Sequence, residues 1–347
     1  MAHLANGLSP DKYDLHLGII TDSDPGPFKL PPWVTVHCLA TSRVRSSALR
    51  LLQLIRRLHP QLILSGMFHL NFLVLLLRPF LPRDTRVLIR QNGTVSAALA
   101  FGDLPACTGI LYKLLYPQAD RVICQAASMA RDLANTLAIA ENHLAVLPNP
   151  LDIEALRAES GPRRQPGTPT SPHLLAVGRL APVKGFDLLL EALAIVKATY
   201  PGVRLSILGS GPQDAFLKAM CARLGLGRSV QFLGEVSQPA HFFAEASLFV
   251  LSSRHEGMPN ALLEAAAAGL PLVALPASGG VVDLLRNQPG AWLAADVSSP
   301  ALAESLLAAL QVLEPGKRFA HDFIEPFRIE NSIHAYEDLI DATLAHA

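Results

Sequence analysis

The residues LFVLSSRHEGMPNALLEAAAAGLPLVAL at positions 248–275 contain a strand, a helix and a second strand in close succession. Leu248–Leu251 and Pro271–Leu275 are short apolar runs, and Asn260–Ala268 between them has the alanine- and leucine-rich composition of a helix. Short apolar runs bounded by turn residues are typical of strands, and strands that alternate with helices build parallel sheets. This part of the sequence therefore predicts an α/β fold.

The same alternation continues toward the N-terminus. Apolar runs at Leu174–Val177, Arg204–Leu208 and Val230–Leu233 are separated by segments of helical composition, and a less regular version of the pattern precedes them. The segment Arg163–Pro172 is rich in Pro, Thr and Gly, which is typical of a linker. We therefore expect two doubly wound α/β domains, joined by this linker and separated by a cleft.

The composition excludes several classes of protein. The 347 residues include 29 Lys and Arg and 29 Asp and Glu, so the formal net charge is zero. Non-specific binding to nucleic acid requires a clustered surplus of Lys and Arg, and we expect no nucleic-acid partner. A hydrophobic content of 50% is too high for a disordered chain.

The cysteines and the N-terminus indicate a cytoplasmic protein. Cys38, Cys107, Cys124 and Cys221 are far apart and form no C-x-x-C pair, which argues against a zinc site and against a disulfide scaffold. The N-terminus lacks the basic and apolar regions of a signal peptide. The apolar run Phe72–Leu77 is shorter than the roughly 20 residues of a membrane span.

The strongest candidate for a binding motif is Glu256 to Glu264, directly after the strand Leu248–Leu251. Ligands of open parallel sheets bind beyond the carboxyl ends of the strands. Pro259 suits the first turn of a helix, and the backbone N–H groups from Gly257 to Asn260 would then attract an anion. Each glutamate alone is best explained as a solvated carboxylate, but the spaced pair in this loop favours a ligand that offers hydroxyl groups.

A second candidate follows the strand Leu174–Val177. Here Arg179 and Lys184 lie in a loop framed by Gly178 and Gly185. Arg binds phosphate oxygens in a bidentate manner and Lys adds a point charge, so this loop suits a diphosphate. The alternative is a surface loop that contains both cations by chance.

Two glycine pairs are weaker signals. Gly209-Ser-Gly211-Pro212 follows the strand Arg204–Leu208, and it is explained equally well as a tight turn. Gly279-Gly280 follows the strand Pro271–Leu275 and fits either a close approach to phosphate or the start of a helix. Neither pair completes the G-x-G-x-x-G pattern of dinucleotide-binding proteins.

Together these motifs resemble the retaining nucleotide-sugar glycosyltransferases of family 4, which have the GT-B fold. The resemblance is carried by G-R-L-x-x-x-K-G at 178–185, G-S-G-P at 209–212, F-L-G at 232–234 and E-x7-E at 256–264. These four motifs occur in the order and spacing of the family. The resemblance continues more weakly through residues 116–134 and 147–156.

The resemblance implies a role for each matching residue. Arg179 and Lys184 would hold the donor diphosphate, Glu264 would bind the ribose hydroxyls, and Glu256 would lie near the donor sugar. The backbone near Leu233 would meet the nucleobase. The implied catalytic residues are Glu256, Arg179 and Lys184, and the implied donor-binding residues are Gly178, Arg179, Lys184, Leu233, Glu256, Gly257, Met258, Pro259, Asn260 and Glu264.

The N-terminus departs from the family pattern. Members usually begin with a strand and a glycine-rich loop, whereas MAHLANGL has the composition of a helix end, so we expect the first βα unit of this domain to be missing. The expected domains are an acceptor-side domain at 1–165 and a donor domain at 173–325. Residues 326–347 would form a helix that crosses back to the first domain.

The resemblance implies transfer of a sugar from a nucleoside diphosphate sugar to a glycan or lipid-linked acceptor, such as a polysaccharide or lipopolysaccharide intermediate. Configuration would be retained, and neither a metal nor a cofactor would be needed. One alternative is a nucleotide-sugar binding protein without transferase activity, because of the missing unit. A second is a GT-B epimerase, and a dinucleotide oxidoreductase is disfavoured.

Other residues have simpler explanations. Asp22-Ser-Asp24 matches a D-x-D metal motif but fits an acidic turn, and His255 lacks the second histidine of a zinc protease. His69 and the loop Arg90–Thr94 follow strands, where they could approach the reacting sugar or serve as structural caps. The apolar segment Asn71–Leu81 suits a buried crossover helix, and the alternative is peripheral contact with the inner face of the membrane.

Overall fold

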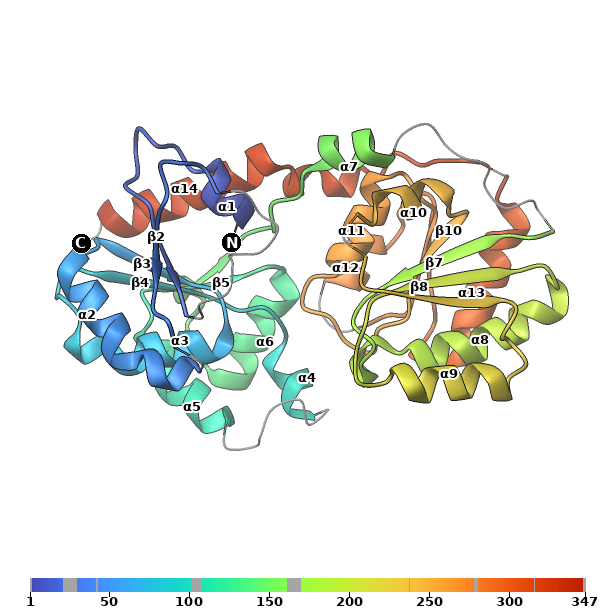
Figure 1. Ribbon diagram of the computed structural model, residues 1–347, viewed down its shortest axis with the longest axis horizontal. Coiled ribbons are helices and arrows are strands. Elements are labelled where there is room, and N and C mark those ends of the chain that lie inside the picture. The colour runs from blue at the N-terminus through green and yellow to red at the C-terminus, as the bar shows by residue number, and fades with distance from the viewer. Residues whose placement is uncertain are drawn as a thin grey trace. The chain divides into compact units, whose positions relative to one another are not determined.

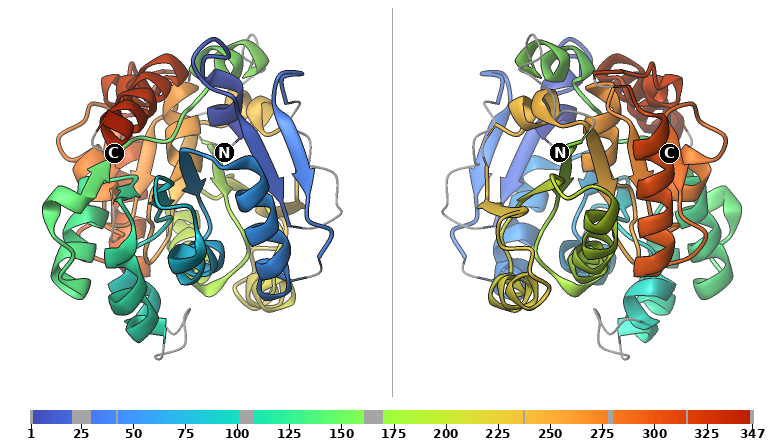
Figure 2. Two further views of the ribbon diagram at one scale, coloured as in Figure 1. Left: turned by 90° about the vertical axis from the view of Figure 1, so that its left-hand side faces the viewer. Right: turned by 90° about the vertical axis from the view of Figure 1, so that its right-hand side faces the viewer.

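The computed structural model of the chain describes residues 2–20, 30–41, 43–100, 108–160, 170–236, 238–277, 280–314 and 316–345. These residues form two compact units (Figures 1 and 2). The first unit is Met1–Pro150 together with Pro326–Ala347, and the second is Leu151–Glu325. Each unit is an α/β structure with parallel strands, as the alternating sequence pattern predicts.

The second unit is built on a six-stranded parallel sheet with the strand order β12-β11-β10-β7-β8-β9. The strands are β7 (His173–Val177), β8 (Arg204–Leu208), β9 (Val230–Gly234), β10 (Leu248–Leu251), β11 (Leu272–Ala274) and β12 (Ala291–Leu293). All residues of β10 and β11 are buried, as expected for strands covered on both faces.

This strand order places the two candidate loops beside each other. From β7 the chain adds β8 and β9 on one side, and it then returns to add β10, β11 and β12 on the other. The strand order therefore reverses between β7 and β10, which are hydrogen-bonded neighbours. Crevices at such switch points are where doubly wound folds bind ligands. The loops with Arg179 and Glu256 follow these two strands.

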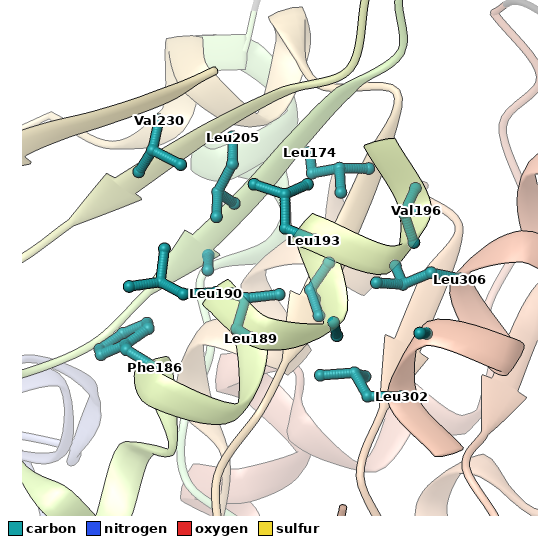
Figure 3. Close-up of a cluster of buried hydrophobic side chains, with 14 of the residues drawn as sticks. Leu174, Phe186, Leu189, Leu190, Leu193, Val196, Leu205, Val230, Leu302 and Leu306 are labelled. Atoms are coloured by element: carbon teal, nitrogen blue, oxygen red, sulfur yellow. The ribbon is translucent and has the colours of Figure 1, made fainter. Parts of the chain in front are cut away.

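The helices of the second unit cover the sheet around a large apolar core. They are α7 (Ile153–Ser160), α8 (Phe186–Thr199), α9 (Asp214–Arg223), α10 (Ala240–Glu245), α11 (Asn260–Ala267), α12 (Val281–Leu285) and α13 (Ser299–Val312), with the 3₁₀ turns η5 (Pro182–Lys184) and η6 (Asp322–Phe327). Leu189 and Leu193, one turn apart on α8, are fully buried. Figure 3 shows Leu193 near Leu174 of β7, with Leu302 and Leu306 of α13 in the same cluster.

Within its described residues, the first unit contains two separate parallel sheets. β1 (His16–Ile19) pairs with β2 (Thr35–Cys38), and β3 (Leu62–Ser65), β4 (Arg86–Arg90), β5 (Arg121–Cys124) and β6 (Leu144–Val146) form a four-stranded sheet. Its helices are α1 (Ala2–Gly7), α2 (Ala48–Leu58), α3 (Phe68–Leu77), α4 (Val95–Ala100), α5 (Thr108–Leu115), α6 (Ala127–Leu137) and α14 (Ile329–Ala345), and its 3₁₀ turns are η1 (Val44–Ser47), η2 (Arg78–Phe80), η3 (Tyr116–Gln118) and η4 (Glu141–His143).

The C-terminal helix α14 packs against the first unit. Its residues Ile333, Tyr336 and Ile340 share an apolar cluster with Leu4 of α1 and Leu88 of β4. α1 and α14 are so close that a Cβ atom at Gly7 would lie 2.5 Å from Cγ1 of Ile333. The first residues of the chain are therefore part of this core.

The boundary between the units differs from the expected one at 165–173. The structure assigns α7, which precedes the linker-like segment, to the second unit. α7 packs on α10 and α11, and Nε of Arg157 donates a hydrogen bond to the backbone oxygen of Ala267, at 3.2 Å. Local composition did not reveal this, because the contact joins residues that are 110 positions apart.

Among the described residues, no helix combines the length and hydropathy that a membrane span requires. The apolar segment of α3, which suggested a buried crossover helix, has Phe72, Leu73, Val74 and Leu75 buried against the first unit. The same helix also exposes part of its surface.

Candidate functional site

Two hydrogen bonds to backbone oxygens join the loops after β7 and β10. Oγ of Ser252 donates to the backbone oxygen of Lys184, at 2.9 Å, and the backbone N–H of Arg254 donates to the oxygen of Val183, at 2.8 Å. The 3₁₀ turn η5 is thereby fixed to the segment that follows β10. These hydrogen bonds position the side chains of both loops before any ligand binds.

An ion pair reinforces the junction. Arg254 binds both carboxylate oxygens of Asp187, with N–O distances of 2.8 and 2.6 Å, and its Nη1 also donates to the backbone oxygen of Pro182, at 2.7 Å. Burial alone would raise the pKa of Asp187, but the hydrogen bonds from Arg254 hold it below its ordinary value. This bidentate pair clamps the start of α8 to the loop after β10.

Gly185 is required where the two loops meet. Its φ is 61°, in the left-handed region, and a Cβ atom there would lie 2.0 Å from the backbone oxygen of Ser252. Any other residue would both strain the backbone and collide with the neighbouring loop. The second glycine of the G-R-L-x-x-x-K-G motif thus allows the close approach of the two loops.

Lys184 and Glu256 are brought into direct contact at this junction. Nζ of Lys184 lies 2.6 Å from Oε1 of Glu256, and Oγ of Ser253 donates to the same oxygen, at 2.5 Å. The Glu256 side chain is 8% exposed and the Lys184 side chain 26%. The lysine stem passes over Gly178, where a Cβ atom would lie 3.4 Å from Cδ of Lys184.

Arg179 is exposed in the loop after β7, and Leu233 is exposed near the end of β9. Within the described residues, the Arg179 side chain makes no hydrogen bond or ion pair, and its guanidinium is open to solvent. Leu233 lies at the carboxyl end of β9 and is 37% exposed. The Leu233 side chain itself lines a cavity with His173, Ser206 and Phe242, so only the backbone around Leu233 remains a candidate for contact with a ligand held by Arg179.

The start of α11 differs in part from the expected anion site. Pro259 is the N-terminal cap of α11 and has no N–H, and the N–H of Asn260 donates to the oxygen of Met258, at 3.0 Å. The backbone N–H groups of Gly257 and Met258 are therefore the candidates for anion contact in this loop. The prediction that the N–H of Asn260 is free for an anion is wrong, because that N–H donates within a tight turn.

Glu264 lies one turn into α11, on the same face as Asn260. Its carboxylate is half-buried, and in the described part of the chain it has no hydrogen-bond partner. Burial raises the pKa of Glu264 to about 7. A half-buried carboxylate without a partner is costly, and hydroxyl groups of a ligand would supply the missing hydrogen bonds.

The G-S-G-P segment has a structural role in supporting the loop of Arg179. The N–H of Gly209 donates to the oxygen of Gly234, at 2.6 Å, and the N–H of Leu180 donates to the oxygen of Ser210, at 2.9 Å. Gly209 has a φ of 130°, and a Cβ atom there would lie 2.0 Å from the oxygen of Gly178. The G-S-G-P segment thus forms a tight turn, which was one of the two explanations that the sequence allowed.

Sequence reasoning missed Ser252, Ser253, Arg254 and Asp187. Their signal was weak, because a Ser-Ser-Arg segment after a strand is common in solvent-exposed loops. The informative feature was its position directly after β10, next to the switch point of the sheet. Asp187 gave no separate signal, since an acidic residue in the first turn of a helix is usual.

The candidates in the first unit are occupied by local contacts. The side chain of Asn92 donates to the backbone oxygen of Gly66, and Oε1 of Gln91 accepts from the Tyr116 hydroxyl, at 2.6 Å. His69 is exposed and packs edge-on against Phe68, with ring centroids 4.3 Å apart. Asn92 thus links its loop to Gly66, whereas the first N–H groups of α4, those of Val95 and Ser96, donate to Oδ2 of Asp132 at 2.6 and 3.2 Å, so the helix-cap alternative for Asn92 is wrong. Asp22-Ser-Asp24 and Gly279 lie outside the described residues.

Two family models match this chain, one in each half. The model for glycosyl transferases group 1 matches residues 162–322, and the model for glycosyltransferase family 4 matches residues 1–155. An uncharacterized glycosyltransferase of Haemophilus influenzae is 35% identical over 120 residues, which cover 35% of this chain and 34% of the relative.

One further relative and one solved structure extend this likeness. The N-acetylgalactosamine-N,N'-diacetylbacillosaminyl-diphospho-undecaprenol 4-alpha-N-acetylgalactosaminyltransferase of Campylobacter jejuni is 27% identical over 62% of this chain and 58% of its own. The match therefore spans less than two thirds of either curated relative.

HepE from Anabaena, solved in complex with UDP and glucose, superposes with a TM-score of 0.77 at 17% identity, over 98% of this chain and 94% of HepE. At this identity the superposition establishes the fold. The two family models together match nearly the full length of the chain, and the switch-point architecture of the second unit agrees with them. The chain belongs to the glycosyl transferases group 1, in glycosyltransferase family 4, and has the GT-B fold.

Proposed function

We propose that this protein transfers a sugar from a nucleoside diphosphate sugar to a glycan or lipid-linked acceptor, with retained configuration and without a metal. The donor would bind at the carboxyl ends of β7 and β10. The observation that carries the proposal is the contact between Lys184 and Glu256, at 2.6 Å, beside the exposed Arg179. This arrangement presents two cations at the switch point of a doubly wound sheet.

The two cations suit the charge that develops during transfer. When the bond between the anomeric carbon and the diphosphate oxygen breaks, the diphosphate leaves with additional negative charge. Arg179 and Lys184 would stabilise this charge, assisted by the backbone N–H groups of Gly257 and Met258. Because the contacts of Lys184, Ser252 and Arg254 fix the loops, little reorganisation would be needed at the moment of reaction.

The remaining site residues fit the other parts of the donor. Glu264 would accept hydrogen bonds from the ribose hydroxyls, and the segment around Leu233 would meet the base. Glu256, held by Lys184 and Ser253, would lie near the sugar. UDP in the HepE complex and the diphospho-undecaprenol acceptor in the name of the Campylobacter relative support a nucleotide donor and a lipid-linked acceptor.

The test is a thermal-shift screen against nucleoside diphosphates and nucleotide sugars, each with magnesium and with EDTA. A ligand that binds the folded state raises the melting temperature by mass action. We expect a shift with one nucleotide in both conditions, and its loss in Arg179→Ala. A shift that requires magnesium would refute the metal-independent site.

Turnover separates the transferase from a protein that only binds the donor. The nucleotide identified by the screen is supplied as the corresponding sugar donor, and release of nucleoside diphosphate is measured with and without a crude lipid-linked glycan fraction. Release that depends on the acceptor supports transfer. Donor binding without any release supports the alternative of a nucleotide-sugar binding protein.

A further inference from the structure

The second unit contains a cavity of about 450 Å³ on one face of its sheet. This is the cavity that the Leu233 side chain lines, and it extends from there to the amino-terminal ends of the strands. Its walls come from β7, β8, β9 and α10, and they include His173, Arg204, Ser206, Arg228, Gln231 and Phe242. Pockets that hold small molecules have volumes of about 300–1,000 Å³. The cavity is therefore large enough for a small-molecule ligand.

The cavity exists because one face of these strands is only partly covered. Side chains of a strand alternate between the two faces of the sheet. Leu174 and Leu205 are buried in the core with α8 and α9, so their neighbours His173 and Ser206 point to the opposite face, and Gln231 of β9 is exposed there. Figure 1 shows α10 on the side of β7 and β8 opposite α8 and α9. With six residues, α10 is too short to cover all three strands.

His173 is fixed in the wall of the cavity. Its Nε2 lies 2.8 Å from Oγ of Ser206, and the ring forms a further hydrogen bond to the backbone of Glu245. Burial lowers the pKa of His173, and the charge of Arg204 lowers it further, although Glu245 acts in the opposite direction. The imidazole is therefore neutral at pH 7, and this wall keeps its shape before any ligand binds.

Two arginines lie at the amino-terminal end of the cavity. Arg204 is the first residue of β8 and pairs in register with His173, and Arg228 comes two residues before β9. Both side chains are exposed, and within the described part of the chain neither guanidinium makes a hydrogen bond or an ion pair. Among the described residues that line the cavity, Glu245 is the only acidic one. The excess of positive charge favours an anionic ligand.

The position of these arginines separates the cavity from the proposed donor site. The loops with Arg179 and Glu256 follow the carboxyl ends of β7 and β10, whereas Arg204 and Arg228 lie at the opposite ends of their strands. β7 has five residues. At about 3.3 Å per residue, its two ends are roughly 13 Å apart. A phosphate held by the two arginines would therefore not reach Arg179.

We propose that this cavity binds a phosphomonoester that carries hydroxyl groups, the chemistry of a sugar phosphate. The phosphate would lie between Arg204 and Arg228, because guanidinium groups suit phosphate oxygens. Hydroxyl groups of the ligand would exchange hydrogen bonds with Ser206 and Gln231, which offer both donors and acceptors. Phe242 would contact the apolar C–H groups of the ligand. The proposal does not depend on the activity proposed above.

The experiment is calorimetric titration of the full chain at pH 8, with mannose 6-phosphate, inorganic phosphate and mannose as separate probes. At this pH a phosphomonoester is a dianion, since its second pKa is about 6. We expect mannose 6-phosphate to bind about tenfold more tightly than inorganic phosphate, because only the sugar adds hydrogen bonds to Ser206 and Gln231. Mannose alone should bind more weakly than either. Because no nucleotide sugar is present, this result can fail while the proposed transferase function stands.

Matched arginine variants test the phosphate contacts. Arg204→Ala and Arg228→Ala should each weaken binding of mannose 6-phosphate about tenfold, since each removes a charge-assisted hydrogen bond. The control Arg223→Ala changes an exposed arginine of α9, outside the cavity, and should leave binding unchanged. Melting temperatures of the three variants should match that of the unchanged protein, because all three side chains are exposed.

Two further variants separate the parts of the ligand and the two sites. Gln231→Ala should weaken binding of mannose 6-phosphate about threefold and leave that of inorganic phosphate unchanged, because the amide would contact only the sugar hydroxyls. Arg179→Ala, which alters the loop of the proposed donor site, should leave binding of both probes unchanged.

Three results would overturn the proposal. The first is mannose 6-phosphate that does not bind, or that binds no more tightly than inorganic phosphate. The second is binding that Arg223→Ala weakens as much as Arg204→Ala does, which would indicate attraction by surface charge in general. The third is binding that is lost in Arg179→Ala and kept in Arg204→Ala and Arg228→Ala. That pattern would place the phosphate in the loop after β7 and not in the cavity.

Discussion

Nζ of Lys184 and Oε1 of Glu256 are 2.6 Å apart, although 72 positions separate the two residues in the sequence. The pair connects the loop after β7 to the loop after β10, the two strands between which the order of the sheet reverses. Glu256 also accepts a hydrogen bond from Ser253, so its carboxylate is fixed from two sides. A phosphate held by Lys184 would therefore lie at a defined distance from this carboxylate.

Lys184→Ala should reduce both donor affinity and stability. The substitution leaves the Glu256 carboxylate, which is 8% exposed, without its ionic partner. Loss of one partner of a largely buried pair is destabilising, here by about 1–3 kcal/mol because Lys184 itself is partly exposed. The measurement is urea unfolding, and Lys184→Ala with Glu256→Gln in one chain should recover part of the loss. The effect of Glu256→Gln on the free energy of unfolding is compared in the unchanged protein and in Lys184→Ala. If Glu256→Gln costs the same in both, the two side chains are not coupled.

Arg179→Ala should affect ligand binding alone. Because the Arg179 side chain is exposed and makes no described contact, its removal should change the free energy of unfolding by less than about 0.5 kcal/mol. Donor affinity, measured by calorimetry, should fall at least tenfold, since one phosphate contact is lost. An unchanged affinity would show that the diphosphate binds elsewhere. In contrast, Lys184→Ala should lower both the donor affinity and the free energy of unfolding under the same conditions.

Gly185→Ala should destabilise the second unit strongly. A Cβ atom at Gly185 would lie 2.0 Å from the oxygen of Ser252, so the two loops would have to separate. Gly225 is a matched control, because its φ of 67° is similar to the 61° of Gly185 but a Cβ atom there would meet nothing within 4 Å. Gly225→Ala should cost about 1 kcal/mol and Gly185→Ala at least about 2 kcal/mol more, measured by urea unfolding. Equal effects would mean that the loops can part without cost.

The sequence was sufficient to predict the strands of the second unit and the loops that carry the motifs. Apolar runs such as Leu248–Leu251 are found as strands within one or two residues, because their burial on both faces leaves a clear signal. The family resemblance and the GT-B fold were predicted from the same part of the chain and are confirmed. These features depend on residues that are close together in the sequence.

Contacts between distant segments could not be predicted in the same way. The pair Lys184–Glu256 depends on the strand order, which no local pattern encodes, and so does the clamp of Arg254 on Asp187. The turn at Met258–Asn260 also escaped prediction, because proline was assigned to the helix itself and not to its cap. The apolar runs Leu15–Ile20 and Val34–Leu39 predict β1 and β2, but local patterns do not show which strands pair, so their separate sheet was not predicted.

Glu264→Gln should stabilise the protein at pH 8 and leave it nearly unchanged at pH 5. Burial raises the pKa of Glu264 to about 7 from 4.5, so between these values the folded chain holds a proton that the unfolded chain releases. The free energy of unfolding therefore falls as pH rises through this window. Glutamine carries no charge, so the substitution removes the cost of burying an ionised carboxylate. This cost is about 2 kcal/mol at pH 8 after solvent screening is allowed for. The measurement is the melting temperature of Glu264→Gln and of the unchanged protein at pH 5 and at pH 8.

The same carboxylate should make donor affinity depend on pH. Ribose hydroxyls donate to the ionised form, so binding favours loss of the proton, and the affinity for a nucleotide sugar should fall about tenfold from pH 8 to pH 6. A nucleotide sugar is the suitable probe, because its diphosphate has no proton to exchange in this range. Glu264→Gln should bind more weakly and with no pH dependence. If that variant keeps the dependence of the unchanged protein, Glu264 does not face the donor, and its raised pKa reflects burial alone.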